Sequence, residues 1–381
     1  TNIFDMIREK DLLIHLPYES FDESVVNFLY SAANDKDVLA IKQTLYRVSS
    51  SSPVVQALEK AVQNGKQVTV LMEVKARFDE ANNILMARRL EKAGAHVIYG
   101  LVGLKTHSKC TLVIRREKDG IRRYVHVATG NYNASTAKLY TDLGILTCSD
   151  RFGIDASAFF NLLSGYSDPP IWDSFIVAPI NLRQRCIELI DREIHFAKNG
   201  EDAHMIAKMN SLLDKGIIEK LYEASQAGVK IELIVRGICV LIPGIPGVSD
   251  NITVRSIVGR FLEHSRIFWF RNGGREELYI SSADWMPRNL NDRVELMVPI
   301  EDPEIKRRLK QMVDIELSDN QKAHIMQADG TWLKTISAEN QLCAQEYFQK
   351  IAEKRDAEDE MTLAQKLEPY TPVLGHGDGS D

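Results

Sequence analysis

The chain has 381 residues, and at about 150 residues per domain this length predicts two compact domains with an appendage. Hydrophobic residues at 44% and charged residues at 26% exclude a mainly disordered, collagen-like or coiled-coil chain. The net charge is −6, of which residues 351–381 carry −5 through 8 acidic and 3 basic side chains, so the nearly neutral remainder lacks the basic surface expected of a nucleic-acid-binding protein.

The first predicted unit is a strand, a helix and a strand. Residues 38–46 predict a strand, residues 53–64 an amphipathic helix that Gly65 ends, and residues 67–74 a second strand. Further along, residues 111–115 and 122–128 predict a hairpin. His107 and Lys109 stand just before this hairpin, and small and polar residues follow it at 129–133.

The same order recurs in the second half of the chain. Residues 204–210, 216–227 and 230–235 predict a strand, a helix ended by Gly228 and a strand. From Arg47 to Gly65 is 18 positions, and from Asn210 to Gly228 is also 18. A second predicted hairpin, residues 267–270 and 278–280, again follows a histidine and a cation, His264 and Arg266. The alternative is that two α/β domains share a common build and the histidines coincide by chance.

The repeat predicts an α/β fold of two similar domains, each a mixed β-sheet flanked by helices, related by pseudo-twofold symmetry. Prolines at 169 and 170 place the boundary, giving a first domain at 1–170 and a second at 171–318. Residues 338–367 have helical composition, and residues 375–381 are glycine-rich and acidic. We therefore expect residues 319–381 to form a C-terminal helix and a flexible tail.

Cysteine usage and hydropathy bear on the compartment. The five cysteines are an odd number without C-x-x-C spacing, which predicts neither a disulfide framework nor a zinc site and favours a reducing cytoplasm. The richest apolar stretch, residues 231–248, contains two charged residues, two prolines and three glycines. No transmembrane segment is therefore predicted.

A histidine followed two positions later by a cation, once in each half, suits attack on phosphorus. A neutral imidazole offers one nitrogen as a nucleophile at neutral pH, and a protonated partner can serve as the acid for the leaving oxygen. The cation points to the same face of a strand and can neutralise phosphoryl oxygens. We predict His107 and His264 as catalytic residues that divide these roles across the pseudo-twofold axis.

Cations at the ends of the predicted strands form the expected phosphate site, because α/β sheets carry their sites there. For Arg47, Arg77 and Arg236 singly, a surface ion pair is the alternative. Tyr140 and Trp285 follow site loops, where an aromatic face could stack on a nucleotide base. The histidines outside the repeat are expected to be structural or solvated. The predicted phosphate-binding residues are Arg47, Arg77, Lys105, Lys109, Lys208, Asn210, Arg236 and Arg266.

Six stretches between residues 11 and 318 resemble the phospholipase D superfamily in outline and the bacterial polyphosphate kinases more closely. The similarity lies in the order and spacing of these stretches, whereas a lone H-x-K motif is weak evidence. They are residues 41–47, 76–80, 105–109, 129–133, 235–239 and 281–286.

The resemblance implies reversible transfer of the ATP γ-phosphate to the end of an inorganic polyphosphate chain through a phosphohistidine. His107 matches the phosphorylated position of the family, and His264 matches its second essential histidine. Tyr140 and Arg236 match positions that contact ATP. His264 is expected to act as an acid or stabiliser on the side of the site that binds the nucleotide. Arg47 and Arg77 match positions associated with magnesium; because a guanidinium has no lone pair for a metal, we expect both to hold oxygens of Mg²⁺-bound phosphate.

The resemblance also implies partners and a setting. ATP or ADP and polyphosphate would be the substrates, with Mg²⁺ as the cofactor. Family members are about twice as long, so the chain is expected to hold only the two C-terminal catalytic domains. Members are commonly oligomeric and some associate peripherally with membranes, and the residues of this chain leave both a homo-oligomer and membrane association open.

Two other functions compete with the kinase. One is a phosphodiesterase of the phospholipase D kind, but that motif places an aspartate five positions after the lysine, where this chain has Ile114. The second half also has Arg266 in place of lysine, and lipid hydrolysis is disfavoured. The other is a catalytically silent polyanion-binding module, which would not need the paired histidines.

Overall fold

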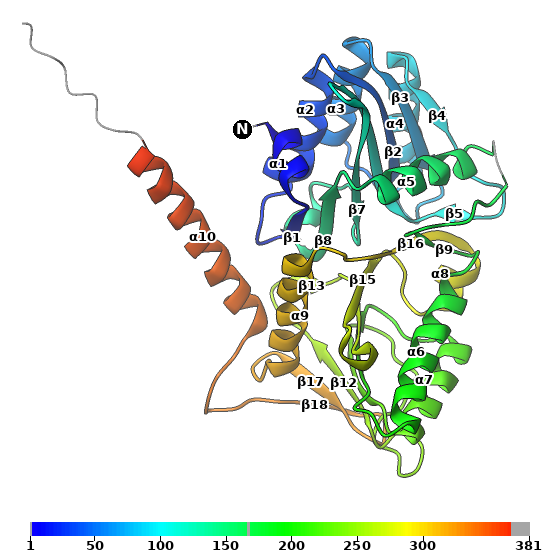
Figure 1. Ribbon diagram of the computed structural model, residues 1–381, viewed down its shortest axis with the longest axis vertical. Helices are drawn as coiled ribbons and strands as arrows, with labels where there is room; N and C mark the ends of the chain where they lie inside the picture. The colour runs from blue at the N-terminus through cyan, green and yellow to red at the C-terminus, as the bar shows by residue number, and fades with distance from the viewer. Residues whose placement is uncertain (1, 166–167, 367–381) are drawn as a thin grey trace, which may run out of the picture.

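Two β-sheets, one for each half of the chain, form the framework of the computed structural model, which describes residues 2–165 and 168–366 (Figure 1). Helices cover both sheets, and the two domains meet near the middle of the molecule. The predicted fold class, two α/β domains with mixed sheets and a C-terminal helix, is confirmed.

The first sheet is mixed. Its strands run in the order β1-β8-β7-β6-β2-β3-β4, with β2, β3 and β4 parallel and the others antiparallel to their neighbours. The strands are β1 (Leu12–Leu16), β2 (Val38–Tyr46), β3 (Gln67–Glu73), β4 (His96–Ile98), β6 (Lys109–Glu117), β7 (Gly120–Ala128) and β8 (Tyr140–Thr147). Its helices are α1 (Ile3–Glu9), α2 (Asn27–Asn34), α3 (Pro53–Gln63), α4 (Glu80–Ala93) and α5 (Asp150–Leu163).

The second sheet repeats this plan with the order β18-β17-β12-β11-β10-β14-β15-β16, and β9 pairs with β16. The strands are β9 (Ile176–Ala178), β10 (His204–Met209), β11 (Lys230–Val235), β12 (Ile252–Ile257), β14 (Ile267–Phe270), β15 (Glu277–Ser281), β16 (Arg293–Pro299), β17 (Ala323–Met326) and β18 (Trp332–Lys334). The helices are α6 (Leu182–Lys198), α7 (Lys215–Ala227), α8 (Pro287–Asn291), α9 (Pro303–Ser318) and α10 (Ala344–Lys366).

Local signals explain why the repeated helices begin where they do. The hydroxyl of Ser52 accepts a hydrogen bond from the backbone N–H of Val55 at the start of α3, and Pro53 occupies the first turn. In the second half, Asp214 caps α7 in the same way by accepting from the N–H of Ile217. Both helices therefore begin at side-chain caps, with α3 following β2 and α7 following β10.

The two domains exchange short strands. β5 (Lys105–Thr106) belongs to the first half of the chain but pairs in parallel with β16 of the second sheet. β13 (Leu262–Glu263) belongs to the second half but pairs in parallel with β8 of the first sheet. An apolar cluster with members such as Leu143, Phe159, Val294 and Leu309 spans both domains. The contact between the domains is therefore both hydrogen-bonded and apolar.

The C-terminal region differs from the prediction. Residues 319–343 carry β17 and β18, which extend the second sheet past residue 318, where the second domain was predicted to end. These strands are short and flanked by polar residues, so they gave little sequence signal. The helix predicted over 338–367 begins later, as α10, and diverges from the body of the molecule in Figure 1. The predicted tail at 375–381 lies outside the described residues.

None of the helices in residues 2–165 and 168–366 has the length and apolar character that crossing a membrane requires.

Candidate active site

A cavity of about 640 Å³ lies where the two sheets meet, and both domains line it. Its volume is in the range of small-molecule sites. Nine of the eleven predicted site residues line the cavity, which leaves out Lys109 and Lys208. The nine are Arg47, Arg77, Lys105, His107, Tyr140, Asn210, Arg236, His264 and Arg266. The pseudo-twofold pairing of the histidines therefore brings both rings to one space.

The cavity is strongly basic. Seven arginine and lysine side chains line it, against the two carboxylates of Asp284 and Asp292. Two of the seven, Arg288 and Arg293, were missed by the sequence analysis. Both lie in the segment of α8 and β16, outside the stretches that the repeat had marked. Such a concentration of cations over a nearly neutral chain favours a polyanionic ligand.

His107 is held by a carboxylate from the other domain. Its Nδ1 lies 2.6 Å from Oε1 of Glu295, which is fully buried on β16. The backbone N–H of His107 donates to the carbonyl of Val294, so the exchanged strand β5 brings the two side chains together. Glu295 also accepts hydrogen bonds from Ser282 and from Asn289.

The protonation of His107 and Glu295 follows mainly from their burial. Burial and the nearby cations hold the pKa of His107 well below its ordinary value, so the ring is neutral. Burial also raises the pKa of Glu295. A neutral ring that donates Nδ1–H to a carboxylate has its lone pair on Nε2, and that nitrogen is the one able to attack an electrophile.

His264 is held in the same way by the first domain. Its Nδ1 lies 2.8 Å from Oδ1 of Asp142 on β8, and Thr129 donates its hydroxyl to the same oxygen at 2.7 Å. Burial lowers the pKa of His264, while the charge of Asp142 opposes that shift. A Cβ atom at Gly130 would lie 2.0 Å from Oδ2 of Asp142, so only glycine lets this carboxylate approach.

Each domain thus supplies the carboxylate for the histidine of the other domain. Asp142 and Glu295 occupy corresponding strands, β8 and β16. Neither was singled out from the sequence. A signal was present, because residues 143–146 after Asp142 and residues 296–298 after Glu295 carry no polar side chain, so each carboxylate borders an apolar run.

A chain of polar contacts fixes the basic residues of the second domain. Arg266 is buried and forms a two-point ion pair with Asp284, with Nε–Oδ1 at 3.0 Å and Nη2–Oδ2 at 3.1 Å. The backbone N–H of Asn210 donates to the same Asp284. The side-chain oxygen of Asn210 accepts from Nε of Arg236 at 2.9 Å. Because Nε is engaged, the Nη atoms of Arg236 remain for a ligand.

Lys109 lies behind the cavity wall rather than on it. It is 1% exposed, its Nζ has no hydrogen-bond partner, and the ammonium stands 5.7 Å from the ring centroid of Tyr46. Burial lowers the pKa of Lys109 to about 7. An unpartnered buried ammonium is unfavourable by itself, so this group is suited to an anion that enters from the cavity.

The structure corrects the prediction that Lys208 holds phosphate. Its Nζ is buried between Glu263 at 2.6 Å and Glu316 at 2.9 Å, and it does not line the cavity. The repeat placed Lys208 near the end of β10, but its side chain lies on the face that α9 covers. A lysine that already has two carboxylate partners has no free charge for a phosphate.

Two residues at the mouth of the cavity have unusual backbone conformations. Arg47 has φ of 53° and Phe78 has φ of 71°, both in the left-handed region that non-glycine residues rarely adopt. Such conformations collect at ligand sites because the surrounding structure must hold them. Phe78 is 89% exposed beside Arg77, whose guanidinium lies 4.9 Å from its ring centroid.

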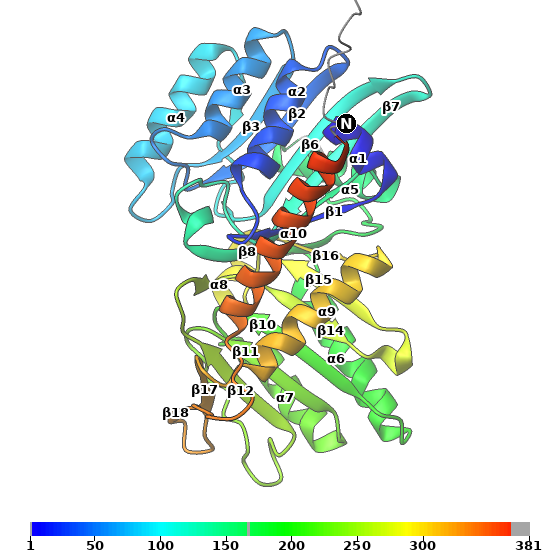
Figure 2. The same cartoon turned by 90° about the vertical axis from the view of Figure 1, so that its left-hand side faces the viewer.

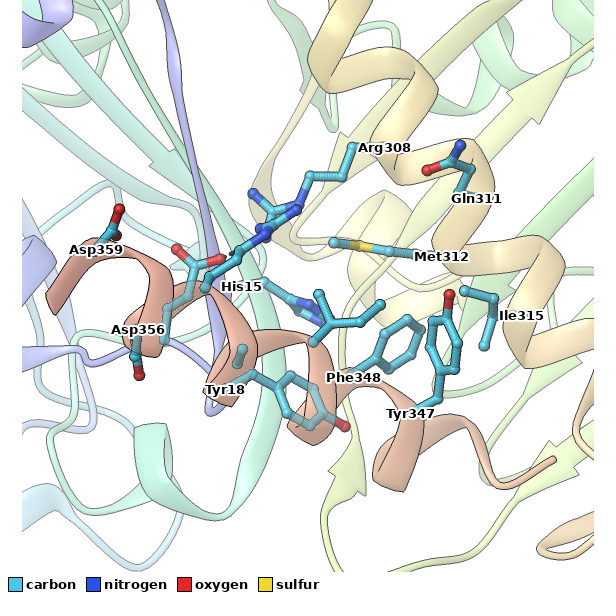
Figure 3. Close-up of a pocket in the computed structure, with 14 residues that line it drawn as sticks. His15, Tyr18, Arg308, Gln311, Met312, Ile315, Tyr347, Phe348, Asp356 and Asp359 are labelled. Carbon is cyan, nitrogen blue, oxygen red and sulfur yellow. Dashed lines mark hydrogen bonds and ion pairs between the residues drawn. The ribbon is translucent and has the colours of Figure 1, made fainter. Parts of the chain in front are cut away.

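The histidines outside the repeat that the structure shows as buried make structural contacts. His126 is buried with Nδ1 at 2.7 Å from the hydroxyl of Tyr132, and burial lowers its pKa to about 3. His15 lines a second cavity of about 210 Å³ between β1, α9 and α10 (Figure 3). This cavity has an apolar floor that includes Met312 and Phe348, and none of the predicted site residues lines it. The basic cavity is therefore the candidate active site.

The fold and the cavity together define an α/β protein of two similar halves, with two carboxylate-held histidines facing a cationic space suited to phosphoryl groups. Family models agree in detail. The model for polyphosphate kinase C-terminal domain 1 matches residues 2–169, and the model for C-terminal domain 2 matches residues 175–345. The chain belongs to the polyphosphate kinase family.

Individual relatives support this assignment. A polyphosphate kinase of Halalkalibacterium halodurans is 60% identical over 323 residues, covering 85% of this chain and 46% of the relative. One of Synechocystis is 55% identical over 356 residues, covering 92% of this chain and 49% of the relative. The chain thus spans about half the length of the curated relatives that it matches.

Solved structures agree on the fold. The crystal structure of a polyphosphate kinase from Porphyromonas gingivalis matches with a TM-score of 0.87 at 39% identity, over 94% of this chain and 55% of that one. A phosphatidylserine synthase from Haemophilus influenzae matches with a TM-score of 0.55 at 12% identity, covering 93% of this chain and 95% of that one. The second likeness concerns the fold alone.

Proposed function

We propose that this chain is the catalytic part of a polyphosphate kinase, which passes the γ-phosphate of ATP to the end of a polyphosphate chain through a phosphohistidine on His107. The observation that carries the proposal is the carboxylate-held, neutral His107 in a cavity lined by seven cationic side chains. A nucleophile, a second histidine and a basic lining together suit phosphoryl transfer, whereas simple anion binding needs only the basic lining.

In the first step, Nε2 of His107 attacks the γ-phosphorus of ATP. The new N–P bond forms as the bond from that phosphorus to the β,γ-bridging oxygen breaks, and ADP leaves. The ring of the phosphohistidine gains positive character while Nδ1–H stays hydrogen-bonded to Glu295 at 2.6 Å. The carboxylate therefore stabilises the ring most when the phosphoryl group is attached.

In the second step, a terminal oxygen of the polyphosphate chain attacks the phosphorus of phospho-His107. The P–O bond forms as the N–P bond breaks, and the nitrogen recovers its lone pair. Both steps are reversible because the P–O bond of a phosphoanhydride and the N–P bond of a phosphohistidine have comparable free energies of phosphoryl transfer. Lys105 and Arg293, at paired positions on β5 and β16, lie beside His107 and are suited to the phosphoryl oxygens.

His264 serves the leaving oxygen of the nucleotide. Its ring lies 5.2 Å from the ring of Tyr140, and its Nε2 lies 3.2 Å from Nη1 of Arg266. The charge of a bound triphosphate would raise the pKa of His264 and so favour the protonated, donating form. We assign the nucleotide to the side of Tyr140 and Arg236.

Magnesium enters this proposal with the phosphates. Among residues 2–165 and 168–366, no group of three His, Cys, Asp or Glu side chains is placed to hold a metal ion. The guanidinium groups that line the cavity have no lone pair for a metal, and of its two carboxylates Asp284 is already paired with Arg266, which leaves Asp292. The chain therefore fits Mg²⁺ held by phosphate oxygens, with Arg47 and Arg77 holding further oxygens of the same phosphates.

Labelling with γ-³²P ATP tests the proposal. The wild-type chain should acquire label that is stable to alkali and labile to acid, and His107→Ala should acquire none. His195→Ala is the matched control, because His195 lies on α6 outside the cavity, with Asn199 as its hydrogen-bond partner, and label should persist there. Label that survives His107→Ala would remove this residue from the proposed role. Turnover of a simple phosphodiester without nucleotide would support the phosphodiesterase alternative.

A further inference from the structure

A buried polar network lies directly behind His264. At its centre is Glu263, 2% exposed, whose Oε2 accepts from Nζ of Lys208 at 2.6 Å and from the hydroxyl of Thr141 at 2.8 Å. Lys208 also donates to Glu316 and, at 2.8 Å, to the hydroxyl of Ser265. Nothing in the proposed reaction uses these groups, although Glu263 and Ser265 flank His264 in the chain.

The other oxygen of Glu263 is held by the C-terminal helix. Nε2 of Gln345, in the first turn of α10, donates to Oε1 of Glu263 at 2.8 Å and to the carbonyl of Phe261 at 2.9 Å. Oε1 of Gln345 accepts from the backbone N–H of Phe261 at 3.0 Å. The amide of this one side chain, 4% exposed, therefore makes three hydrogen bonds to the segment that leads into His264.

The network reaches both sides of the histidine. On the backbone side, Leu262 and Glu263 form β13, which pairs with Tyr140 and Thr141 at the start of β8. The residue after Thr141 is Asp142, the acceptor for Nδ1 of His264. A shift of Glu263 would therefore move both the ring and the carboxylate that orients it.

Contacts with both domains hold α10 in place, so that Gln345 can fix the position of Glu263. The carboxylate of Asp319 accepts from the N–H of Ala344 at 2.8 Å, at the first residue of the helix. One turn further on, Phe348 packs against His15 and Tyr18, with distances between ring centroids of 5.2 Å and 5.6 Å. Figure 3 shows these three side chains beside the second cavity. The helix thus touches the first domain as well as the second, and Figure 2 shows it crossing in front of both.

We propose that Gln345 and the Lys208–Glu263 pair are positioning residues that fix His264 against Asp142, so that the C-terminal helix completes the active site from outside it. The inference rests on the proposed function only in giving His264 a part in the reaction. The geometric claim, that Gln345 holds His264 in its buried, Asp142-bound place, stands apart from it.

Gln345→Met tests the inference, because methionine keeps the length of the side chain and removes all three hydrogen bonds. The matched control is Gln349→Met, one turn along α10, where Nε2 of the glutamine donates to Glu353 on the surface. The first readout is the pKa of His264 by NMR of the histidine-labelled chain, with its signal identified by loss in His264→Asn. Asp142, Arg266, Lys109 and the ring of Tyr140 face this imidazole and are unchanged in both variants.

The expected result is a pKa of His264 that rises toward its ordinary value in Gln345→Met, because a loosened strand admits water and weakens the burial that lowers it. Gln349→Met should leave that pKa at the wild-type value. The second readout is ATP-dependent polyphosphate synthesis, where kcat should fall about tenfold while KM for ATP changes less than about twofold, as for a misplaced catalytic group.

Two results would overturn the inference: a pKa of His264 and a kcat in Gln345→Met equal to those of Gln349→Met, or loss of cooperative unfolding in Gln345→Met and equally in Gln345→Glu. The second result would make the network a requirement for folding. The NMR readout separates this inference from the proposed function. A wild-type chain without phosphotransfer activity would count against the function, while the pKa comparison would still decide the position of His264.

Discussion

Replacing Glu295 by glutamine removes a charge beside His107 while keeping the shape of the side chain. The amide oxygen can still accept Nδ1–H of His107 and the amide of Asn289, which both meet Oε1 in the wild-type chain. The nearby hydroxyl of Ser282 can turn to accept from the new amide N–H₂. The ring orientation should therefore survive, and what is lost is the negative charge facing the ring of the proposed phosphohistidine.

The magnitude follows from the kind of hydrogen bond. A hydrogen bond to a charged group contributes about 1.5–3 kcal/mol and a neutral one about 0.5–1.5 kcal/mol, and the midpoints of these ranges differ by roughly 1.25 kcal/mol, a factor of about eight in rate. Glu295 is fully buried, so solvent does not screen this term. We expect the rate of His107 labelling in Glu295→Gln to fall about eightfold in a rapid-quench assay.

Stability should not fall with the rate. Folding raises the pKa of Glu295, chiefly through burial, and a carboxyl with a raised pKa destabilises the folded state at every pH above its unfolded-state pKa. At neutral pH the amide should therefore leave the melting temperature unchanged or higher. Glu232→Gln is the matched control, since Glu232 lies 2.7 Å from Nε2 of His204, a pair remote from the cavity lining. A labelling rate within twofold of wild type, or a lower melting temperature, would refute the reasoning.

Two further substitutions test the surroundings of His264 and the nucleotide side. Gly130→Ala places a methyl group 2.0 Å from the carboxylate of Asp142, so turnover should fall about 100-fold because Asp142 no longer aligns His264. In the control Gly216→Ala the nearest atom to the new methyl group is 3.6 Å away, and turnover should stay at the wild-type rate. Arg236→Lys keeps the charge but loses the guanidinium fork, so KM for ATP should rise about tenfold with little change in kcat, and an unchanged KM would place the nucleotide elsewhere.

Much of the fold could be predicted because the hydrophobic periodicity of strands and helices recurs in the same order in both halves of the chain. Strands such as β10 and β11 begin at the residues that the spacing had indicated, and Gly228 ends α7 as expected. The exchange of β5 and β13 could not be predicted, because each strand has two residues and pairs with a partner more than a hundred positions away. Periodicity reports only on neighbours along the chain.

The candidate site was predicted unevenly for a related reason. His107 and His264 stood out because they recur at one place in each repeat. Glu295 and Asp142 were missed because their roles depend on the partner half, although each carboxylate is followed directly by an apolar run in its strand. Lys208 was assigned to phosphate from its place on the strand, but the two carboxylates that bind it come from β13 and α9, which sequence spacing does not bring near.

Since the carboxylate that orients each imidazole belongs to the opposite half, the orientation of both histidines depends on the same contact between the halves. A small separation of the halves would break both hydrogen bonds and leave both rings free to rotate at once. In the proposed transfer, the nucleophile and the residue that serves the leaving oxygen would then lose their alignment together. Any contact that holds the halves together, including the helix that lies across them, should therefore affect every step of the proposed reaction rather than one step of it.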